Sequence, residues 1–367
     1  MGGLRAALKL NAGIWREWFS GVVLSFYRGR TCRGPLVSVT EALENPRNIL
    51  IIPDLRAGGL FLGASKFRAL RNRYPKAEVS LLTDARREYI ARQMPFIDDV
   101  ILCSESLMPL GPKLGDLIGR LRRREFDVVF CFGAPECLLP AYLCYRSGGR
   151  LRVGLYREDV PFFNFRIVPG QDVRYEADRL SLLLRTLNIS EGEGELGWSI
   201  SPEGAKKILD RYLGERRGQE KFVGIDISSG IGPPVSYRQW QGIVRAVDQT
   251  CRSIIFFDFE QRQVANKLKE MLCQRALLFQ TDDLPRTVAL MEVCDGFIAG
   301  NTDLFHLSVA KWLPTVGLVS KQDIPRWVPA DCPYVRVLDR AGLDETQAGG
   351  IVEILAQMQA GRAEKRR

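Results

Sequence analysis

Residues 300–310, Gly-Asn-Thr-Asp-Leu-Phe-His-Leu-Ser-Val-Ala, contain the only histidine of this 367-residue chain, His306. The apolar residues 296–299 that precede this stretch predict a strand, and residues 307–311 predict a helix after it. Good N-cap residues separate the two, so a helix is expected to begin here. The start of a helix that follows a strand offers free N–H groups and a positive dipole end to an anion, with His306 as a titratable donor one turn away. The candidate anion-binding residues are Gly300, Asn301, Thr302, Asp303 and His306. The alternative is a capped turn and a helix that merely contains a histidine.

Outward from this stretch, short apolar strands alternate with helical segments from residue 48 onward. Strands are expected at 48–52, 78–82, 100–103, 127–132 and 152–155, and again at 221–227, 253–257, 276–279, 296–299 and 315–319. Helices are expected at 60–74, 84–93, 114–124, 136–145 and 173–187, and then at 236–247, 261–272, 284–293 and 344–359. This rhythm predicts an α/β protein with parallel sheets covered by helices on both faces.

The polar, glycine-rich residues 190–197 lack apolar periodicity and predict an exposed linker. The expected domains are therefore 48–189 and 198–343. A segment 1–47 precedes them, and a C-terminal helix with a basic tail, 344–367, follows. In the N-terminal segment an apolar helical stripe is flanked by cations, which predicts either a helix in a membrane interface or a helix packed on the first domain. The stripe consists of Trp15, Trp18, Phe19, Val22 and Phe26.

Composition narrows the functional classes. A hydrophobic content of 46% and a charged content of 26% are typical of globular domains. The net charge of +9 is spread along the chain without a nucleic-acid-binding motif, so it favours anionic small molecules or an anionic lipid surface over nucleic acid. Nine cysteines without a CxxC pair indicate reduced thiols in a cytoplasm, and a single histidine argues against a His-rich metal site. No apolar run is long enough to span a membrane, and no cleavable signal peptide is evident.

Two other strand-to-helix turns carry polar groups. The turn after the first strand contains a potential base, Asp54, a cation, Arg56, and two glycines that permit a close backbone approach, Gly58 and Gly59. An ordinary turn is the alternative. The turn that opens the second half offers small residues whose backbone N–H groups can surround a phosphate. These residues are Ser228, Ser229 and Gly230, with Arg238 as the nearest cation and Ser236 as the expected helix cap.

The 300–310 stretch resembles the motif Gly-Asn-Asp-(Ser/Thr)-Gly-Pro-x-His-Leu-Ala of glycosyltransferase family 9, the heptosyltransferase-like inverting enzymes. Residues 314–318, Pro-Thr-Val-Gly-Leu, follow at the right distance, although the Gly-Pro is absent and the stretch is one residue shorter. The resemblance also includes the first strand, the Arg-Ala-Leu-Arg-x-x-Tyr-Pro helix at 68–75, the strand 126–130 and the segment 175–180. It extends over about residues 48–318.

The resemblance implies the GT-B fold, in which two Rossmann-like domains face each other across a cleft. It implies an inverting transfer of a heptose or similar sugar from a nucleotide-sugar donor to a lipopolysaccharide-core or other glycolipid acceptor. The donor would bind at residues 301–306 with help from 228–230. No metal or other cofactor is implied, so Asp258-Phe259-Glu260 is not taken as a metal site.

Two departures from the family pattern concern the chemistry. The family's aspartate, which deprotonates the acceptor, falls on Gly59, so Asp54 is the substitute candidate for the catalytic base. The family's phosphate-binding lysine falls on Pro233 or Pro234. The alternatives are a nucleotide-sugar epimerase with the same fold and a non-catalytic homologue that binds glycolipid or a partner enzyme. The expected location is the cytoplasm, peripheral to the inner face of the membrane.

Overall fold

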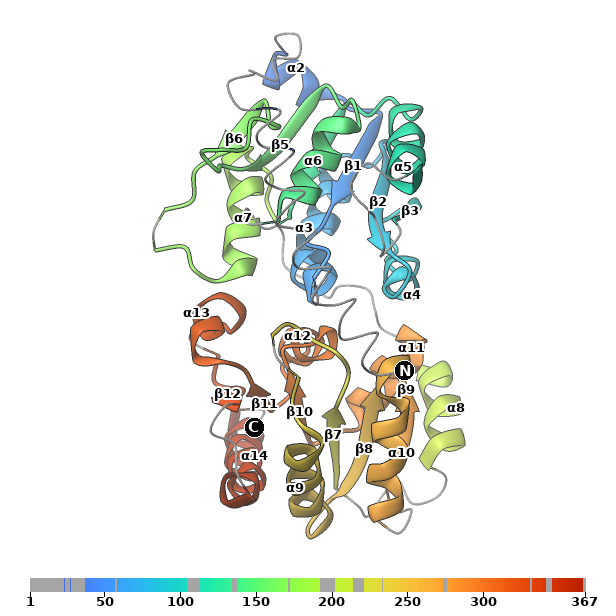
Figure 1. Cartoon of the computed structure of the whole chain (residues 1–367), viewed down its shortest axis with the longest axis vertical. Helices are drawn as coiled ribbons and strands as arrows, with labels where there is room; N and C mark the ends of the chain where they lie inside the picture. The colour runs from blue at the N-terminus through green and yellow to red at the C-terminus, as the bar shows by residue number, and fades with distance from the viewer. Residues whose placement is uncertain are drawn as a thin grey trace. The chain divides into compact units, whose positions relative to one another are not determined.

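The computed structural model of the chain describes residues 23, 27, 37–56, 58–103, 112–133, 137–170, 172–191, 202–213, 221–232, 234–272, 276–330, 332–340 and 345–365. The chain forms two compact units, which are described separately (Figure 1). The first unit comprises Met1–Leu55, Gly63–Val173 and Ala177–Gly194. The second comprises Glu195–Arg367 together with two short segments from earlier in the chain, Arg56–Leu62 and Arg174–Glu176.

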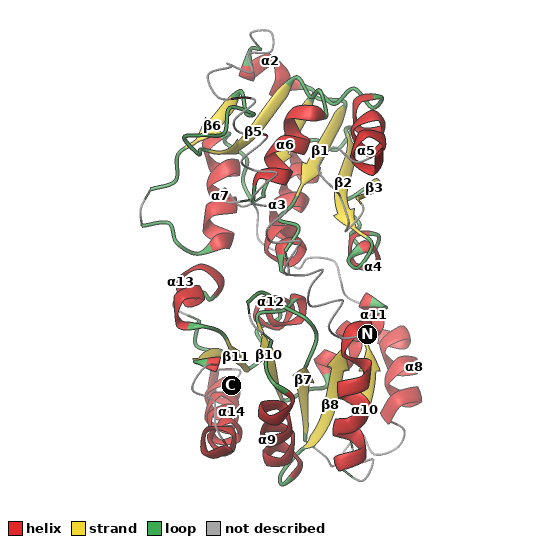
Figure 2. Ribbon diagram, viewed as in Figure 1, coloured by secondary structure: helices red, strands yellow, loops and turns green. Residues whose placement is uncertain are grey.

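The first unit is built on a six-stranded parallel sheet of order β3-β2-β1-β4-β5-β6. Its strands are β1 (Asn48–Ile52), β2 (Glu78–Asp84), β3 (Asp99–Cys103), β4 (Val128–Cys131), β5 (Leu151–Leu155) and β6 (Phe165–Ile167). The helices that begin in this part of the chain are α2 (Val39–Glu44), α3 (Gly59–Arg73), α4 (Glu88–Ala91), α5 (Pro112–Arg122), α6 (Leu138–Arg146) and α7 (Glu176–Thr186). A helix follows each strand from β1 to β4, whereas β5 and β6 are joined by a loop (Figure 2).

Apolar side chains on both faces of the central strands hold these layers together. Leu50 and Ile52 belong to a buried cluster that includes the apolar faces of α5 and α6. On α3, Phe67 packs against Phe132 with ring centroids 5.5 Å apart. Burial on both faces explains why these strands are continuously apolar instead of alternating.

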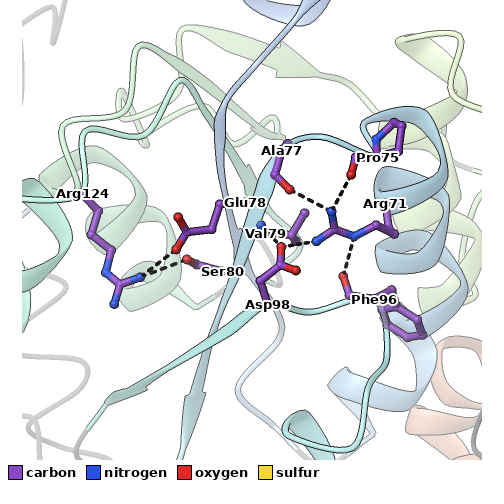
Figure 3. A network of polar contacts seen from close by, with 9 residues as sticks. All are labelled: Arg71, Pro75, Ala77, Glu78, Val79, Ser80, Phe96, Asp98 and Arg124. Atoms are coloured by element: carbon purple, nitrogen blue, oxygen red, sulfur yellow. Dashed lines mark hydrogen bonds and ion pairs between the residues drawn. The ribbon is translucent and has the colours of Figure 1, made fainter.

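Within the helix motif at residues 68–75, Arg71 makes polar contacts with neighbouring loops. Its guanidinium donates to the carbonyl oxygen of Ala77 at 2.8 Å and to that of Phe96 at 3.4 Å (Figure 3). It also pairs with Asp98, whose Oδ2 accepts the N–H of Val79 at 2.7 Å. The arginine thus ties the end of α3 to the loops that enter β2 and β3.

The second unit repeats this architecture with the sheet order β12-β11-β10-β7-β8-β9, again all parallel. Its strands are β7 (Phe222–Asp226), β8 (Arg252–Phe257), β9 (Leu277–Gln280), β10 (Gly296–Gly300), β11 (Thr315–Leu318) and β12 (Val335–Leu338). Its helices are α8 (Pro202–Leu213), α9 (Tyr237–Asp248), α10 (Arg262–Met271), α11 (Leu284–Glu292), α12 (Asp303–Ala310), α13 (Ile324–Trp327) and α14 (Glu345–Lys365).

One buried cluster joins α9, α10 and α14 to the sheet of the second unit, through residues such as Ile225 and Ile298. The helices begin where the sequence signals them. Ser236 and Gln239 form a capping box at α9, and Asp283 caps α11 by accepting the N–H of Arg286 at 2.9 Å. The expected capping role of Ser236 is therefore confirmed.

The predicted α/β fold with two parallel sheets is confirmed, but one predicted helix is wrong. Residues 84–93 do not form one helix, because β2 continues to Asp84 and only Glu88–Ala91 are helical. The Asp84 carboxylate accepts the N–H groups of Arg86 and Arg87 at 2.9 and 3.1 Å, and so stabilises a turn instead. The edge strands β6 and β12 and the helix α8 were not predicted.

All five residues of the predicted N-terminal stripe and most of the predicted linker, 192–197, lie outside the described residues. Among the N-terminal residues that are described, Val23 is buried in the core of the first unit, and Tyr27 packs edge-on against Phe162 at 5.3 Å. These two contacts favour packing on the first domain for this face of the segment. No helix in the described ranges combines the length and apolar composition that a bilayer crossing needs.

Candidate functional site

The strand order of the second unit creates a crevice between β7 and β10. From β7 the chain proceeds outward through β8 and β9, and then returns to β10 on the opposite side. The loops that follow β7 and β10 therefore leave the sheet in opposite directions. Open parallel sheets bind ligands at such a switch point, beyond the carboxyl ends of the strands.

The two predicted donor-binding segments meet at this switch point. The N–H of Ile231 donates to the carbonyl oxygen of Asn301 at 2.8 Å. A Cβ atom at Gly230 would lie 2.3 Å from the same oxygen, so only glycine allows this approach. The structure thus brings the loop 228–232 against the start of α12, which sequence spacing alone could not establish.

Asp226, the last residue of β7, accepts hydrogen bonds from both segments. Its Oδ2 accepts the hydroxyl of Thr302 at 2.5 Å, and its Oδ1 accepts the N–H of Ser228 at 3.0 Å. Complete burial raises the pKa of the Asp226 carboxyl to about 6, although the hydrogen bonds from Ser228 and Thr302 oppose this shift. Asp226 is not among the site residues predicted from the sequence, although a carboxylate that ends an apolar strand is a usable signal.

The backbone of the 228–230 loop is already engaged within the protein. The N–H of Ser228 donates to Asp226, and that of Ser229 donates to Asp258 Oδ2 at 2.8 Å. Asp258 also accepts the N–H of Gln261 at 3.0 Å. An anion in this crevice must therefore be bound by donors other than the N–H groups of Ser228 and Ser229, contrary to the expectation from the sequence.

The start of α12 offers one such donor. Thr302 is the N-cap and accepts the N–H of Phe305 at 3.2 Å. His306 Nε2 lies 2.9 Å from Asn301 Oδ1, and both side chains are buried, each with 3% of its surface exposed. With Oδ1 facing the imidazole, Asn301 Nδ2 is left buried without a hydrogen-bond partner in the described part of the chain. An unsatisfied buried donor is costly and indicates a missing acceptor.

This geometry changes the role expected for His306. Its Nε2 donates to Asn301 Oδ1, so the histidine orients the amide, and the buried amide nitrogen is the group of the pair that still lacks an acceptor. The imidazole is held by Phe305 and Trp327, with ring centroids 5.1 and 5.7 Å away.

Arg56 and Gly58, from the turn that follows β1, belong to the second unit and contact residues around His306. The N–H of Gly58 donates to Asp303 Oδ1 at 2.6 Å. Gly58 has φ +81°, and a Cβ there would lie 2.1 Å from His306 Cδ2, so two independent constraints require glycine. The Arg56 guanidinium lies over the Trp327 ring at 4.9 Å. Arg326 lies over the same ring at 5.1 Å and pairs with the buried Glu176 at 2.8 Å.

The first unit has its own switch point, between β1 and β4. Asp54 follows β1 there and acts electrostatically on the thiol of Cys131, at the end of β4. Burial, the largest cause, raises the pKa of this thiol to about 12, and Asp54 adds to the shift. Asp54 is itself only 2% exposed, while Gly59 is the first residue of α3.

Gly300 and Arg238, two further residues predicted for the donor site, lie at the end of β10 and in the first turn of α9. Gly300 ends β10 and accepts the N–H of Thr302 at 2.9 Å, which shapes the turn into α12. Arg238 lies exposed in the first turn of α9. Within the described ranges, no three His, Cys, Asp or Glu side chains are grouped as metal ligands.

Two Rossmann-like units with this strand order define the GT-B class of fold. Solved structures share it. A glycosyltransferase of family 9 from Veillonella parvula gives a TM-score of 0.67 at 14% identity, with 86% of this chain and 98% of that chain covered. The Escherichia coli ADP-heptose lipopolysaccharide heptosyltransferase II gives 0.64 at 17% identity, with 86% and 99% covered. The expected GT-B fold is thus confirmed, and the resemblance to family 9 is confirmed at the level of the fold.

A curated protein of Haemophilus influenzae named "Putative glycosyltransferase" is 22% identical over 299 residues, which are 77% of this chain and 85% of that protein. No family model matches the sequence. The fold also occurs in the UDP-GlcNAc 2-epimerase from Methanocaldococcus jannaschii, with a TM-score of 0.51 at 10% identity and with 84% of this chain and 92% of that chain covered.

Proposed function

We propose that the protein is an inverting glycosyltransferase of the family 9 type. It transfers a heptose or similar sugar from a nucleotide-sugar donor to a lipopolysaccharide-core or other glycolipid acceptor. The GT-B fold and the similarity to proteins named as glycosyltransferases support this proposal. The observation that carries it is Asn301 Nδ2, a buried donor without a partner at the switch point of the second unit.

The donor's diphosphate is placed at the start of α12. The helix supplies its positive dipole end, and Asn301 supplies a hydrogen bond to a phosphate oxygen. Arg56, which is held over Trp327 within the same unit, adds positive charge. These groups act most strongly where charge develops, on the leaving nucleoside diphosphate, so they favour the transition state over the bound donor.

The transfer itself is a single displacement. The acceptor hydroxyl oxygen forms a bond to the anomeric carbon and loses its proton to a carboxylate base, while the bond from that carbon to the diphosphate breaks. The nucleoside diphosphate leaves with the electron pair, and the configuration at the carbon inverts. We propose Asp54 as the base, because it follows β1 at the switch point of the first unit, and Gly59, at the family's position, cannot accept a proton. The proposed chemistry requires no metal or other cofactor.

A substitution at the buried Asp54 tests its proposed role as the catalytic base. Asp54→Asn keeps the shape of the side chain and removes the base, so turnover should fall about a hundredfold or more while donor affinity stays unchanged. Asp116→Asn, at an exposed position on α5 of the same unit, is the matched control and should change neither quantity. Normal turnover by the Asp54 variant would assign the base elsewhere.

Donor binding is tested first with a panel of nucleotide sugars, including ADP- and UDP-sugars, by thermal shift. A ligand that binds only the native state raises its apparent stability, by about 2.7 kcal/mol when present at about 100 times its Kd. A donor identified in this way is then incubated with lipopolysaccharide cores of defined length, and release of nucleoside diphosphate is followed. The absence of a shift with every nucleotide sugar would refute the proposed function.

The second candidate is a nucleotide-sugar epimerase, which the shared fold favours. Mass spectrometry and NMR of the donor separate the two activities, because an epimerase changes the sugar without any acceptor. The third, a non-catalytic homologue, gains support from the glycine at position 59 and is established if a donor binds but neither activity is found.

We further propose that the protein works in the cytoplasm at the inner face of the membrane, on an anionic surface, and not on nucleic acid. The net charge of +9 and the predicted N-terminal stripe support this location. Because Val23 packs in the core, substitution is a cleaner test than deletion. Trp15→Ser with Trp18→Ser should reduce co-sedimentation with vesicles that contain phosphatidylglycerol, and an undiminished association would oppose the proposal.

A further inference from the structure

Arg340 is a buried cation at the carboxyl edge of the second sheet. It follows the edge strand β12, and only 7% of its surface is exposed. Its guanidinium has one neutral partner, because Nη2 donates to Ser320 Oγ at 2.7 Å. Within the described ranges no carboxylate lies at ion-pair distance from it. Asp323 and Asp339 act on it electrostatically, and Asp339 is engaged by Lys321 at 3.7 Å.

Without a carboxylate at ion-pair distance, Asp323 and Asp339 compensate the desolvation of this guanidinium only in part. Removing a cation from water costs several kcal/mol unless an anion pairs with it. A hydroxyl oxygen does not supply that charge. Burial accordingly lowers the pKa of Arg340, while the two aspartates oppose the shift. The environment therefore favours an anionic group that is not part of the described chain.

The position of Arg340 specifies where that anion would bind. A Cβ built on Gly232 would lie 3.0 Å from Arg340 Nη2, so the guanidinium lies against the backbone of the 228–232 loop. Gly230, two residues earlier, contacts Asn301 in the same way. Two residues of chain span at most about 7 Å. Arg340 and the backbone carbonyl of Asn301 thus contact the same short loop at its two ends.

The backbone of Arg340 is fixed as well. Its carbonyl oxygen accepts Nε2 of Gln239 at 3.0 Å, and Gln239 is part of the capping box of α9. Gln239 therefore fixes the backbone of Arg340, and Ser320 holds its guanidinium, before any ligand arrives. Its planar fork of donors matches the oxygens of a phosphate group.

We propose that Arg340 binds a phosphate group of the donor, and supplies the positive charge that the loop lacks at Pro233 and Pro234. This assignment rests on the proposed function, since it names a further residue of the same donor site. Arg340 belongs to the segment that follows the edge strand β12, and not to the loop that follows β7. Its guanidinium approaches the site beside Gly232 of that loop.

Inorganic pyrophosphate is the probe, measured by calorimetry on the full chain. Arg340→Gln should weaken its binding about 10- to 100-fold, the usual range for a hydrogen-bonded charge. Arg336→Gln is the matched control, because Arg336 lies exposed on the same strand and should leave the affinity unchanged. Arg340→Lys keeps the charge but not the fork and should give an intermediate affinity, which a merely structural role would not produce.

The outcomes separate this inference from the proposed function. Equal pyrophosphate affinity in Arg340→Gln and wild type, or equal losses in both glutamine variants, overturns the role of Arg340. Nucleotide-sugar binding by the wild type would still uphold the proposed function. Lack of pyrophosphate binding by the wild type also overturns the inference. If Arg340→Gln does not fold, the comparison of Arg340→Lys with Arg336→Lys decides, and equal affinities overturn it.

Discussion

Replacing Asn301 with alanine should separate ligand affinity from stability. The wild type contains an unsatisfied buried nitrogen, Asn301 Nδ2, and a satisfied one, His306 Nε2, which lies 2.9 Å from Asn301 Oδ1. The substitution removes the first nitrogen and deprives the second of its partner. Each unsatisfied group costs about 1–3 kcal/mol, so the two changes nearly cancel, and the free energy of unfolding should change by no more than about 1 kcal/mol.

Affinity for a nucleoside diphosphate should respond quite differently. The lost contact is a hydrogen bond to a charged oxygen, worth about 1.5–3 kcal/mol, which corresponds to about a 10- to 100-fold weaker Kd. Calorimetry with ADP and UDP measures the affinity, and urea unfolding without ligand measures the stability.

Ser308→Ala in the same helix is the control with the opposite pattern. Ser308 Oγ donates to the carbonyl oxygen of Phe305 at 2.7 Å and accepts the hydroxyl of Thr315 at 2.9 Å. Its loss should destabilise the protein by about 1–2 kcal/mol without changing affinity. Affinity within twofold of the wild type for Asn301→Ala would refute the role assigned to the amide.

Three further predictions concern the same structure. Gly58→Ala should cost about 1–2 kcal/mol for its positive φ alone and weaken nucleotide binding by displacing the His306 ring, whereas Gly115→Ala, with open space around it, should be neutral or stabilising in urea unfolding. The Asp226 pKa of about 6, raised from 3.8, means that the native state binds more protons than the unfolded state between about pH 4 and 6. Wild-type stability should therefore fall by about 2.4 kcal/mol relative to Asp226→Asn as the pH rises from 4 to 7, and parallel pH profiles would contradict this. Arg71→Ala should destabilise by about 2 kcal/mol in urea unfolding, because it leaves backbone carbonyls without a donor, and a change below about 0.5 kcal/mol would show that they find other partners.

Most strands could be predicted from the sequence because their residues are buried on both faces and form short apolar runs. The strand at 48–52 matches its predicted bounds, and the helix at 284–293 differs by one residue. Two of the four edge strands, β6 and β12, escaped prediction. Only the first residue of β12 is buried, and the other three are exposed or partly exposed. The strand therefore lacks the buried apolar run that marks a central strand. The prediction of a helix at 84–93 was wrong because the Asp84 side chain accepts local hydrogen bonds that compete with helix formation.

The candidate site was predictable only in part. The start of α12 could be located from the row of capping residues, and the glycines of the first turn from their freedom of conformation. The pairing of His306 with Asn301 could not be predicted, because a donor at the start of a helix points equally well at a ligand or at a neighbour. Arg340 lies 39 positions after Asn301 in the sequence. Only the strand order shows that one loop serves both residues.

The composition of the second unit also has a consequence for biosynthesis. Its candidate site draws on Gly58 and Glu176 as well as on residues after 195, so it consists of three separate pieces of the polypeptide. A ribosome releases Gly58 nearly 250 residues before its partner Asp303. The ligand site therefore cannot mature until the chain has been made at least as far as Asp303, and exposure to a nucleotide sugar before that point should leave the nascent chain unaffected. A separately produced fragment that starts at residue 195 would regain the missing contacts only when the earlier part of the chain is supplied in trans.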